Sequence, residues 1–272
     1  MTRIRPLWIA LLLLWSLMPM VWQLVTSFST AEALVDGSIP FLQRWTLDHY
    51  RELLQSDPPF WRYLFNSTVV GGLTTLFTLA LAIPAAYGVA RMPGAVRRSV
   101  RGLTAAAALF PYVLLFLALL ELARHYSLGN NLLTIALPYT GLAMPLALLL
   151  LTAAFEGLPS DLDDAARLEG MSLMQRLRWV LVPLLAPATA STAILVFLFS
   201  WNEYPIALTW LSRTDLLTLP VAMARIAGTS IYAVPYGAYA AATVLGSIPL
   251  LLMVLLCQRQ IVAGLTNGAV KG

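Results

Sequence analysis

Long apolar segments constrain this chain more than any other feature of its sequence. About 20 predominantly apolar residues are needed to cross the hydrocarbon core of a bilayer as a helix, and runs of that length recur here with short connections. Charged residues make up 11% of the 272 residues, whereas ordinary soluble domains carry roughly 25%. The sequence therefore excludes a soluble globular protein and predicts an all-α integral membrane protein. Its six expected transmembrane helices cover residues 7–28, 66–90, 103–123, 132–155, 187–211 and 237–256.

The distribution of basic residues predicts how these helices are oriented. Cytoplasmic loops of membrane proteins carry an excess of Lys and Arg, and six helices place both termini on the same side. With the termini in the cytoplasm, that side holds most of the 17 basic residues. We therefore expect a multi-pass protein with both termini, a loop at 157–186 and a tail at 259–272 in the cytoplasm. A cleaved N-terminal signal peptide is the alternative, because Ala31-Glu32-Ala33 imitates a signal-peptidase site.

Several functions are excluded by the residue types and their arrangement. Lys271 is the single lysine, and the sequence has no GxxxxGK[ST] phosphate loop. His49 and His125 have no HExxH motif or Cys/His cluster near them, so we interpret both as solvated side chains. The arginines are scattered through short loops instead of forming the basic stripe that binds nucleic acid. We expect no catalytic residue, no metal site and no cofactor bound by this chain.

Residues 157–186 contain the signals of a helix, a turn and a second helix. The run Ser160-Asp161-Leu162-Asp163 is a helix-start pattern, in which the serine hydroxyl accepts a hydrogen bond from a first-turn N–H. Gly170 ends this helix, because glycine adopts the left-handed conformation without a side-chain penalty. Immediately afterwards, Ser172 and Gln175 form a capping box that starts the second helix.

Two interpretations of this helix pair are open. It is either an amphipathic loop that lies on the membrane surface, or a rigid knob that docks on a partner and receives force from it. The second helix is amphipathic, as both interpretations require. Its apolar face consists of Leu173, Leu177, Val180 and Leu181, its other face carries Arg176 and Arg178, and Pro183 is expected to end it.

The same region carries a specific resemblance. Asp164-Ala165-Ala166-Arg167-Leu168-Glu169-Gly170, with Pro183 and Pro187 after it, resembles the EAA signature of permeases in binding-protein-dependent ABC importers. The chain departs from the usual pattern because Asp164 replaces the leading Glu and Glu169-Gly170-Met171 replaces Asp-Gly-Ala. The resemblance implies a type I ABC importer permease whose helix-turn-helix coupling loop seats in a cleft of a cytoplasmic ATPase. The implied ATPase-coupling residues are Asp164, Ala165, Ala166, Glu169, Gly170, Arg176 and Pro183.

The likeness extends over nearly the whole chain. Asn66-Ser67-Thr68, Ala85-Ala86-Tyr87-Gly88-Val89-Ala90-Arg91, Trp201-Asn202-Glu203 and the tail 264–272 resemble the maltose-type sugar permeases, in particular the smaller of two paired subunits and the trehalose-type branch. The resemblance implies one permease domain over 1–272, in a bacterial or archaeal cell membrane, that moves a di- or oligosaccharide inward by alternating access. The implied partners are a second permease subunit, a dimeric ATPase that holds ATP and Mg, an extracytoplasmic solute-binding protein, the sugar and the lipid bilayer.

Glu203 is a carboxylate inside an otherwise apolar span, where a charged group needs a partner or a wet cavity. Together with Trp201, Asn202 and Tyr204 it offers the aromatic face and the hydrogen-bonding groups with which proteins hold sugars. These four residues are therefore candidates for the substrate path. The alternative is that Asn202 and Glu203 bond to neighbouring helices or cap a helix end.

Three other features have a structural and a functional interpretation. Pro111 and Pro205 each adjoin a polar side chain inside a span, so they are candidates for kinks that serve gating as well as packing. By resemblance, the loop around Gly228-Thr229-Ser230 faces the solute-binding protein, and a plain connector is the alternative. The tail is, by resemblance, at the ATPase interface, and a disordered end is the alternative. The tail residues concerned are Gly268, Lys271 and Gly272.

Other classes of function remain as alternatives. A permease for a polyol phosphate or another small polar solute would have the same architecture. A secondary transporter would show internal repeats with interrupted helices in both halves, which we do not detect. A membrane enzyme would need clustered acids, histidines or an activated nucleophile, and no GxSxG or similar motif is present.

Overall fold

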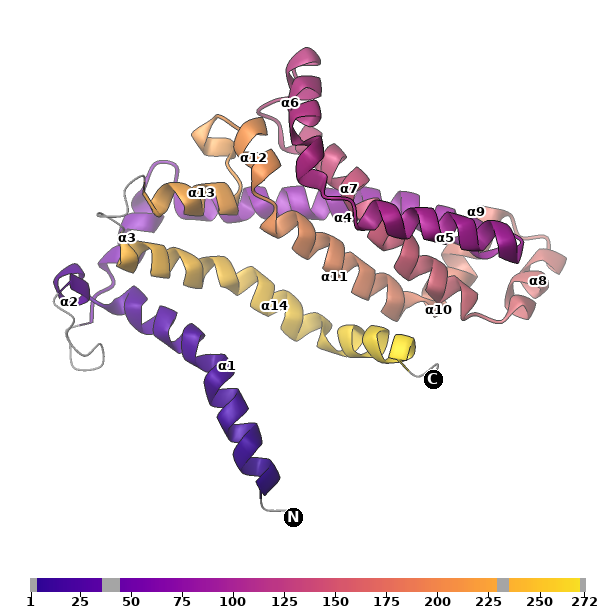
Figure 1. The fold of residues 1–272 in the computed structure, drawn as a ribbon, viewed down its shortest axis with the longest axis horizontal. Coiled ribbons are helices and arrows are strands. Elements are labelled where there is room, and N and C mark those ends of the chain that lie inside the picture. The colour runs from indigo at the N-terminus through magenta and orange to yellow at the C-terminus, as the bar shows by residue number, and fades with distance from the viewer. Residues whose placement is uncertain (1–3, 36–44, 229–234, 270–272) are drawn as a thin grey trace. The chain divides into compact units, whose positions relative to one another are not determined.

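The computed structural model of this protein describes residues 4–35, 45–228 and 235–269. Within these ranges the regular secondary structure is helical apart from one isolated antiparallel bridge, between Ser29 and Trp45, which confirms the all-α prediction. In chain order the helical elements are α1 (Ile4–Phe28), α2 (Ala31–Val35), α3 (Asp48–Gln55), α4 (Phe60–Ala90), α5 (Gly94–Ala108), the 3-10 helix η2 (Tyr112–Leu115), α6 (Phe116–His125), α7 (Leu132–Glu156), α8 (Ser160–Leu168), α9 (Leu173–Gln175), the π-helix η3 (Arg176–Leu181), α10 (Val182–Leu184), α11 (Ala186–Asn202), α12 (Pro205–Trp210), η4 (Thr214–Leu216), α13 (Leu219–Ile226) and α14 (Tyr236–Ala269) (Figure 1).

Four helices in the described residues are by themselves long and apolar enough to cross a membrane. They are Trp8–Phe28 in α1, the whole of α4, the whole of α7, and Tyr236–Gln258 in α14. Two more spans are obtained when each of two bent helix pairs is counted as one: α5 with Tyr112–His125, bent by 76°, and Leu173–Leu184 with α11, bent by 88°. The predicted number of six is reached only with both bent pairs.

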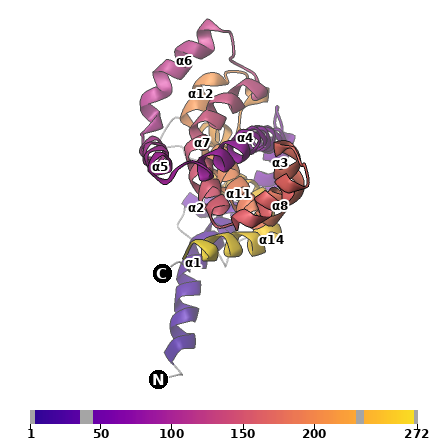
Figure 2. The same ribbon diagram turned by 90° about the vertical axis from the view of Figure 1, so that its right-hand side faces the viewer.

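Prolines interrupt two of the predicted spans. The span expected at 103–123 breaks between α5 and η2, where Pro111 has an extended backbone, and α6 leaves α5 at a sharp angle (Figures 1 and 2). The span expected at 187–211 breaks at Glu203, and Pro205 begins α12. A proline has no N–H and disfavours helical backbone in the residue before it. Pro111 therefore lies at the first break and Pro205 begins the helix after the second, at the two positions where the sequence suggested kinks.

The chain divides into two compact units, Met1–Phe65 with Leu217–Leu252 and Asn66–Leu216 with Met253–Gly272. The single domain expected over 1–272 stays a prediction. In the first unit α3 packs on the end of α1: the hydroxyls of Ser27 and Tyr50 are 2.7 Å apart. His49 is half-buried and its Nε2 lies 3.0 Å from the carbonyl oxygen of Ser29, so the interpretation of this side chain as solvated was wrong.

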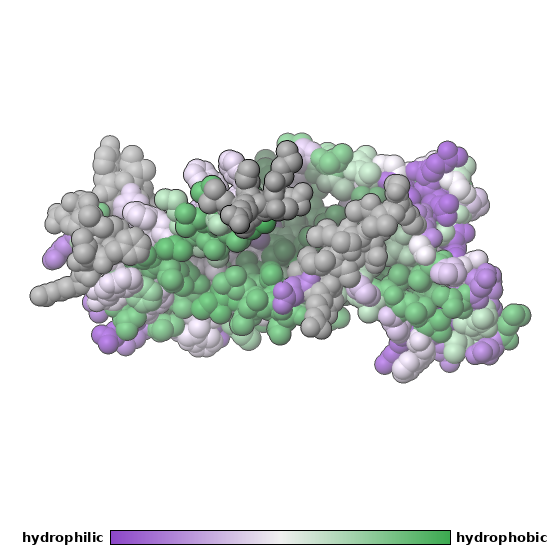
Figure 3. Space-filling model, turned by 90° about the horizontal axis from the view of Figure 1, so that it is seen from below, coloured by the Kyte–Doolittle hydropathy of each residue, from purple (hydrophilic) through white to green (hydrophobic). Residues whose placement is uncertain are grey.

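The core of the second unit joins the membrane spans to the helix pair. Small residues of α4 and α7, such as Ala86 and Ala147, are fully buried in one apolar cluster. The same cluster continues through Phe155 into Leu177 and Leu181 of η3. Hydrophilic side chains gather toward the right of Figure 3, the side on which Figure 1 places α8 and α9. The second helix of the pair is therefore packed on the spans as part of one core.

The contact between α4 and α11 depends on a glycine. A Cβ atom added to Gly71 would lie 2.8 Å from Cε2 of Phe197, whereas one added to Gly72 would meet nothing within 4 Å. Alanine is favoured over glycine in a helix by about 1 kcal/mol, but forcing an extra carbon into a packed contact costs about 1–3 kcal/mol. We expect Gly71→Ala to lower the thermal unfolding temperature in detergent relative to the matched variant Gly72→Ala. Equal unfolding temperatures would contradict this account of the helix contact.

Candidate functional site

The first helix of the pair, α8, begins one residue earlier than predicted. Pro159 occupies the N-cap position, and no side chain caps the helix. Ser160 is the first helical residue, and its hydroxyl donates to Oδ1 of Asp161 at 3.3 Å. The predicted serine cap was therefore wrong, because the extended backbone of Pro159 already turns the chain into the helix.

The corner between the two helices matches the prediction. Gly170 has φ +78°, the left-handed conformation that glycine adopts without strain. Its N–H donates to the carbonyl of Arg167 at 2.9 Å, and the N–H of Met171 donates to the carbonyl of Ala166 at 3.2 Å. These two bonds make the Schellman motif, which satisfies the last carbonyls of α8. A Cβ added to Gly170 would meet nothing within 4 Å, so only its backbone conformation requires glycine.

The second helix starts as predicted but does not end at Pro183. The backbone N–H of Ser172 donates to Oε1 of Gln175 at 2.8 Å, and the N–H of Gln175 donates to the Ser172 hydroxyl at 3.4 Å, which confirms the capping box. The helix then widens into the π-helix η3, and Pro183 lies in α10 after it. A proline is tolerated there because the hydrogen-bonding register changes from π to α, so its missing N–H leaves no bond unmade.

The faces of the second helix were predicted in part. Leu177 and Leu181 are buried and Val180 is half-buried, as expected, but 46% of Leu173 is exposed. Arg178 is exposed, with its guanidinium over the ring of Trp179. Arg176 is buried, with 8% exposed, so its placement on the exposed face was wrong. The reason is a buried acid from α8 that lies opposite it.

That acid is Asp163, on the inward face of α8 with its side chain 3% exposed. It accepts a hydrogen bond from the hydroxyl of Tyr87 in α4 at 2.7 Å and one from Nη1 of Arg176 at 2.6 Å. The side chains of Arg91 and Arg167 approach it at 3.6 and 3.9 Å. Burial raises the pKa of Asp163, but hydrogen bonds from Tyr87 and Arg176 and the neighbouring arginine charges outweigh burial and lower the pKa overall. The carboxylate is therefore ionised at neutral pH.

The outward face of α8 and the corner present most of the predicted coupling residues. Asp164, Ala165 and Glu169 are exposed, as is Leu168 at 90%. Residues four apart on a helix are surface neighbours, so these side chains form one continuous patch, which we call the docking face. Of the other predicted coupling residues, Gly170 and Pro183 are exposed, whereas Ala166 and Arg176 are buried.

The four predicted substrate-path residues lie around the break between α11 and α12. Glu203 is 2% exposed, and its Oε1 accepts the N–H of Ile206 at 2.9 Å. Its Oε2 accepts the N–H of Ala207 at 3.1 Å and the hydroxyl of Tyr139 in α7. These contacts agree with the alternative interpretation, in which the carboxylate caps a helix end and joins neighbouring helices.

The neighbours of Glu203 do not converge with it on one surface. The ring of Trp201 is buried and stacks on Phe197, with ring centroids 5.5 Å apart. Asn202 is exposed and its Nδ2 donates to the carbonyl of Leu198 at 2.8 Å, while Tyr204 is half-buried. A role for this group in solute binding stays a prediction.

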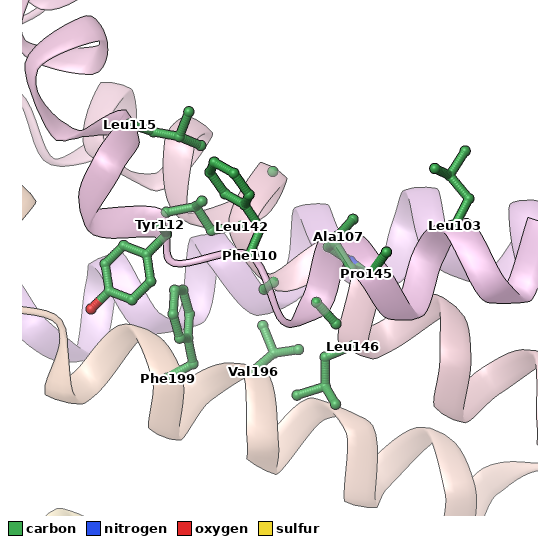
Figure 4. Close-up of a pocket in the computed structure, with 14 residues that line it drawn as sticks. Leu103, Ala107, Phe110, Tyr112, Leu115, Leu142, Pro145, Leu146, Val196 and Phe199 are labelled. Atoms are coloured by element: carbon green, nitrogen blue, oxygen red, sulfur yellow. The ribbon is translucent and has the colours of Figure 1, made fainter.

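A separate open cavity of about 690 Å³ lies between α5, η2, α7 and α11. Figure 4 shows apolar side chains from these elements converging on it, with the hydroxyl of Tyr112 directed away. None of the four predicted substrate-path residues lines it. Its main lining side chains are Leu103, Phe110, Leu115, Leu142, Leu146 and Val196.

The predicted loop and tail residues are described only in part. Gly228 is exposed with φ +84°, and Thr229 and Ser230 lie outside the described residues. Gly268 belongs to α14, which continues as a helix to Ala269. Lys271 and Gly272 lie outside the described residues. In the part of the chain that the structure describes, no group of three or more His, Cys, Asp or Glu side chains is placed to hold a metal ion.

Comparison with known proteins identifies the family. Residues 78–266 match the family described as the binding-protein-dependent transport system inner membrane component. The chain belongs to this family. It is therefore a multi-pass membrane permease, and the resemblance drawn from its EAA-like run is confirmed.

Relatives of this permease include named sugar transport components. It is 37% identical to the trehalose transport system permease protein SugB of Mycobacterium tuberculosis, over 95% of this chain and 93% of that protein. It is 36% identical to the trehalose/maltose transport system permease protein MalG of Thermococcus litoralis, over 94% and 92% of the two chains. It is also 36% identical to the sulfoquinovosyl glycerol transport system permease protein SmoH of Agrobacterium fabrum, over 97% and 92%.

Solved structures show that the fold is that of an ABC importer permease. A chain of a bacterial ABC transporter involved in the import of the acidic polysaccharide alginate matches with a TM-score of 0.79 and 21% identity, over 94% of both chains. A chain of the inward-facing methionine ABC transporter MetNI matches with a TM-score of 0.58 and 18% identity, over 77% of this permease and 99% of that chain. The permease therefore has the predicted type I ABC importer fold.

Sequence reasoning missed the buried side of the permease's helix pair. Asp163 was interpreted only as a helix-start acid and Tyr87 only as part of a family resemblance. In α8 the large apolar residues Leu162 and Leu168 are exposed, while the acid at position 163 and Ala166 point inward. This is the reverse of the usual apolar-inside pattern, so no rule based on residue type assigns Asp163 to the buried side.

The contacts of Glu203 predict a stability effect. Glu203→Gln replaces one acceptor oxygen by an NH₂ group, so at least one of the three donors around it is left unpaired, at a cost of about 1–3 kcal/mol. We expect a lower thermal unfolding temperature in detergent. The matched variant Glu121→Gln changes an exposed carboxylate of α6 and should leave the temperature unchanged. If Glu203→Gln unfolds at the temperature of the unsubstituted permease but takes up solute more slowly, the substrate-path interpretation is the correct one.

Proposed function

We propose that this permease is one membrane subunit of an ATP-driven importer for a di- or oligosaccharide, and that it works by alternating access. The main support for this proposal is the docking face, which is exposed on a helix pair that packs against the membrane spans. Such a surface is suited to receive force from a partner, because α8 is fixed by the bonds of the Gly170 corner and the second helix by its capping box and the shared core. The substrate class is supported by relatives named for trehalose, maltose, diacetylchitobiose and sulfoquinovosyl glycerol transport.

The partner of the docking face is a cytoplasmic ATPase. Asp164 and Glu169 give the face negative charge, and Leu168 gives it an apolar centre. In this proposal both termini and the helix pair lie in the cytoplasm, where the excess of basic residues belongs. ATP and Mg are held by a dimer of that ATPase, and this chain binds no cofactor. The tail at Gly268, Lys271 and Gly272 contacts the same partner.

The other partners lie in and outside the membrane. A second permease subunit completes the path, and a solute-binding protein delivers sugar to the side that includes Gly228-Thr229-Ser230. Trp201, Asn202, Glu203 and Tyr204 are the candidate path residues, and the buried state of Glu203 indicates that it acts there by holding the helix break. In that case Asn202 and Tyr204, which are at least partly accessible, would be the residues that contact the sugar.

Reconstitution tests the proposal. The permease alone in liposomes should neither hydrolyse ATP nor accumulate trehalose or maltose, because it lacks the phosphate loop and lysine used in phosphoryl transfer. With its companion permease, ATPase and solute-binding protein it should show ATP-dependent uptake of one such sugar. ATP turnover by this chain alone would contradict the proposal, as would sugar accumulation driven by an ion gradient without the ATPase.

The corner at Gly170 gives a second test. Gly170→Val forces a β-branched side chain toward a left-handed backbone, at roughly 1–2 kcal/mol, or splays the two helices. This cost is small compared with the burial of the spans, so membrane abundance should stay normal while sugar uptake fails. Gly170→Asn is the matched variant, because asparagine tolerates the left-handed conformation better than other side chains, and it should retain more uptake. Normal uptake and ATPase co-purification for Gly170→Val would show that the corner's geometry is not needed.

A further inference from the structure

A single buried carboxylate joins three separate segments of the permease. Asp163 lies in α8, Arg176 in η3 and Tyr87 near the end of α4, and each pair among the three is hydrogen-bonded. Nη1 of Arg176 reaches both the Asp163 carboxylate at 2.6 Å and the Tyr87 hydroxyl at 3.1 Å. We call these three residues the Asp163 cluster.

The cluster is tied to the spans through the ring of Tyr87. This ring is 6% exposed and packs edge-on against Phe155 of α7, with centroids 5.8 Å apart. The guanidinium groups of Arg91 and Arg176 lie 5.6 and 5.9 Å from the ring centroid, within the range of a cation–π contact. The Tyr87 side chain therefore contacts both sides of the junction between the helix pair and the membrane helices.

Stability alone does not explain a buried ion pair at this position. Desolvating two charges costs several kcal/mol per ion, and a well-packed apolar replacement is often as stable or more stable. What a charged, directional contact adds is orientation, since a salt bridge with hydrogen bonds is satisfied in one geometry. Here that geometry sets α8 against α4.

The helix pair meets the spans on its inward side, α8 through the Asp163 cluster and η3 through Leu177 and Leu181. The Gly170 corner is exposed and a Cβ added there would meet nothing, and the docking-face residues Ala165 and Leu168 point to solvent. A displacement of the docking face therefore acts on the inward contacts of α8. Asp163 accepts the Tyr87 hydroxyl at 2.7 Å, Arg167 donates to the same hydroxyl at 3.4 Å, and Ala166 is buried.

We propose that the Asp163 cluster is the positioning element that holds the helix pair in one orientation on α4 and transmits movement of the docking face to that span. Asp163 and Tyr87 thus become positioning residues for coupling, acting behind the surface that meets the partner. The source of the movement, an ATPase on the docking face, rests on the proposed function. The positioning itself does not, and it can be measured on the permease alone.

The first measurement is a spin-label distance. In a Cys257→Ser background, which removes the single cysteine, labels at Ala85→Cys on α4 and Leu168→Cys on α8 report the orientation of the helix pair in the purified permease. We expect the labelled permease to give one narrow distance distribution. Adding Asp163→Asn or Tyr87→Phe should make this distribution broad. The matched variants are Asp161→Asn, an exposed acid on the same helix, and Tyr126→Phe, an exposed tyrosine, and both should keep the narrow distribution.

Tyr87→Phe keeps the ring packing and removes one hydroxyl, so it carries the test if Asp163→Asn fails to accumulate in the membrane. Unchanged distributions in both cluster variants would overturn the proposal, whatever partner the docking face has. The result does not depend on transport, so failure of the proposed function would appear separately, as absence of ATP-dependent uptake by the unsubstituted permease.

The second measurement is coupling in the reconstituted complex without labels. Losing a charge-assisted hydrogen bond changes an equilibrium by at least about tenfold, so sugar taken up per ATP hydrolysed should fall by at least about tenfold in Tyr87→Phe. The ATPase should still co-purify, because the docking face is unchanged. A purely structural cluster would instead reduce the amount of complex and leave uptake per ATP the same, and that result would overturn the proposal.

Discussion

Every backbone N–H and C=O in the hydrocarbon core must find a partner inside the protein, and the architecture of this permease depends on that requirement. Long helices meet it automatically, which is why α1, α4, α7 and α14 dominate the fold. Where a proline breaks a helix, a side chain has to replace the missing bonds. Glu203 does so at the break before Pro205, because its two oxygens accept the first free N–H groups of α12. A carboxylate in an apolar span is therefore explained by the break beside it.

Buried charges also need partners where the helix pair meets the spans. Arg176 and Asp163 are charges that would be costly to bury alone, and each is acceptable because the other is present. Tyr87 of α4 also donates a hydrogen bond to Asp163, so the ion pair between α8 and η3 is connected to a membrane span. In the proposed function, this connection passes force from a soluble partner to the membrane helices. Glu203 and Asp163 have similar roles. Glu203 holds the start of α12 at the break before Pro205, and Asp163 holds α8, which ends at the Gly170 corner.

Features that depend on near neighbours in the chain were predicted correctly. The left-handed Gly170 and the capping box of Ser172 involve residues three to five positions apart, and the relevant hydrogen bonds form in any chain with that local conformation. The errors had a common origin. Arg176 was assigned to the face opposite the apolar one, Pro183 was expected to end its helix, and Ser160 was expected to cap α8. The buried Asp163 overrode the first preference, the change from π- to α-helix the second, and the backbone of Pro159 the third.

By itself the sequence determined the class of the protein, the number of apolar segments, two prolines at which kinks were expected, and the family. All of these follow from composition, from spacing along the chain and from proline and glycine chemistry. Only the tertiary structure decided which acid faces inward, because Asp163 meets Tyr87 across 76 positions of sequence and Glu203 meets Tyr139 across 64. The physical reason is that a buried charge is positioned by whatever neutralises it, and in a folded helical protein that partner comes from another helix.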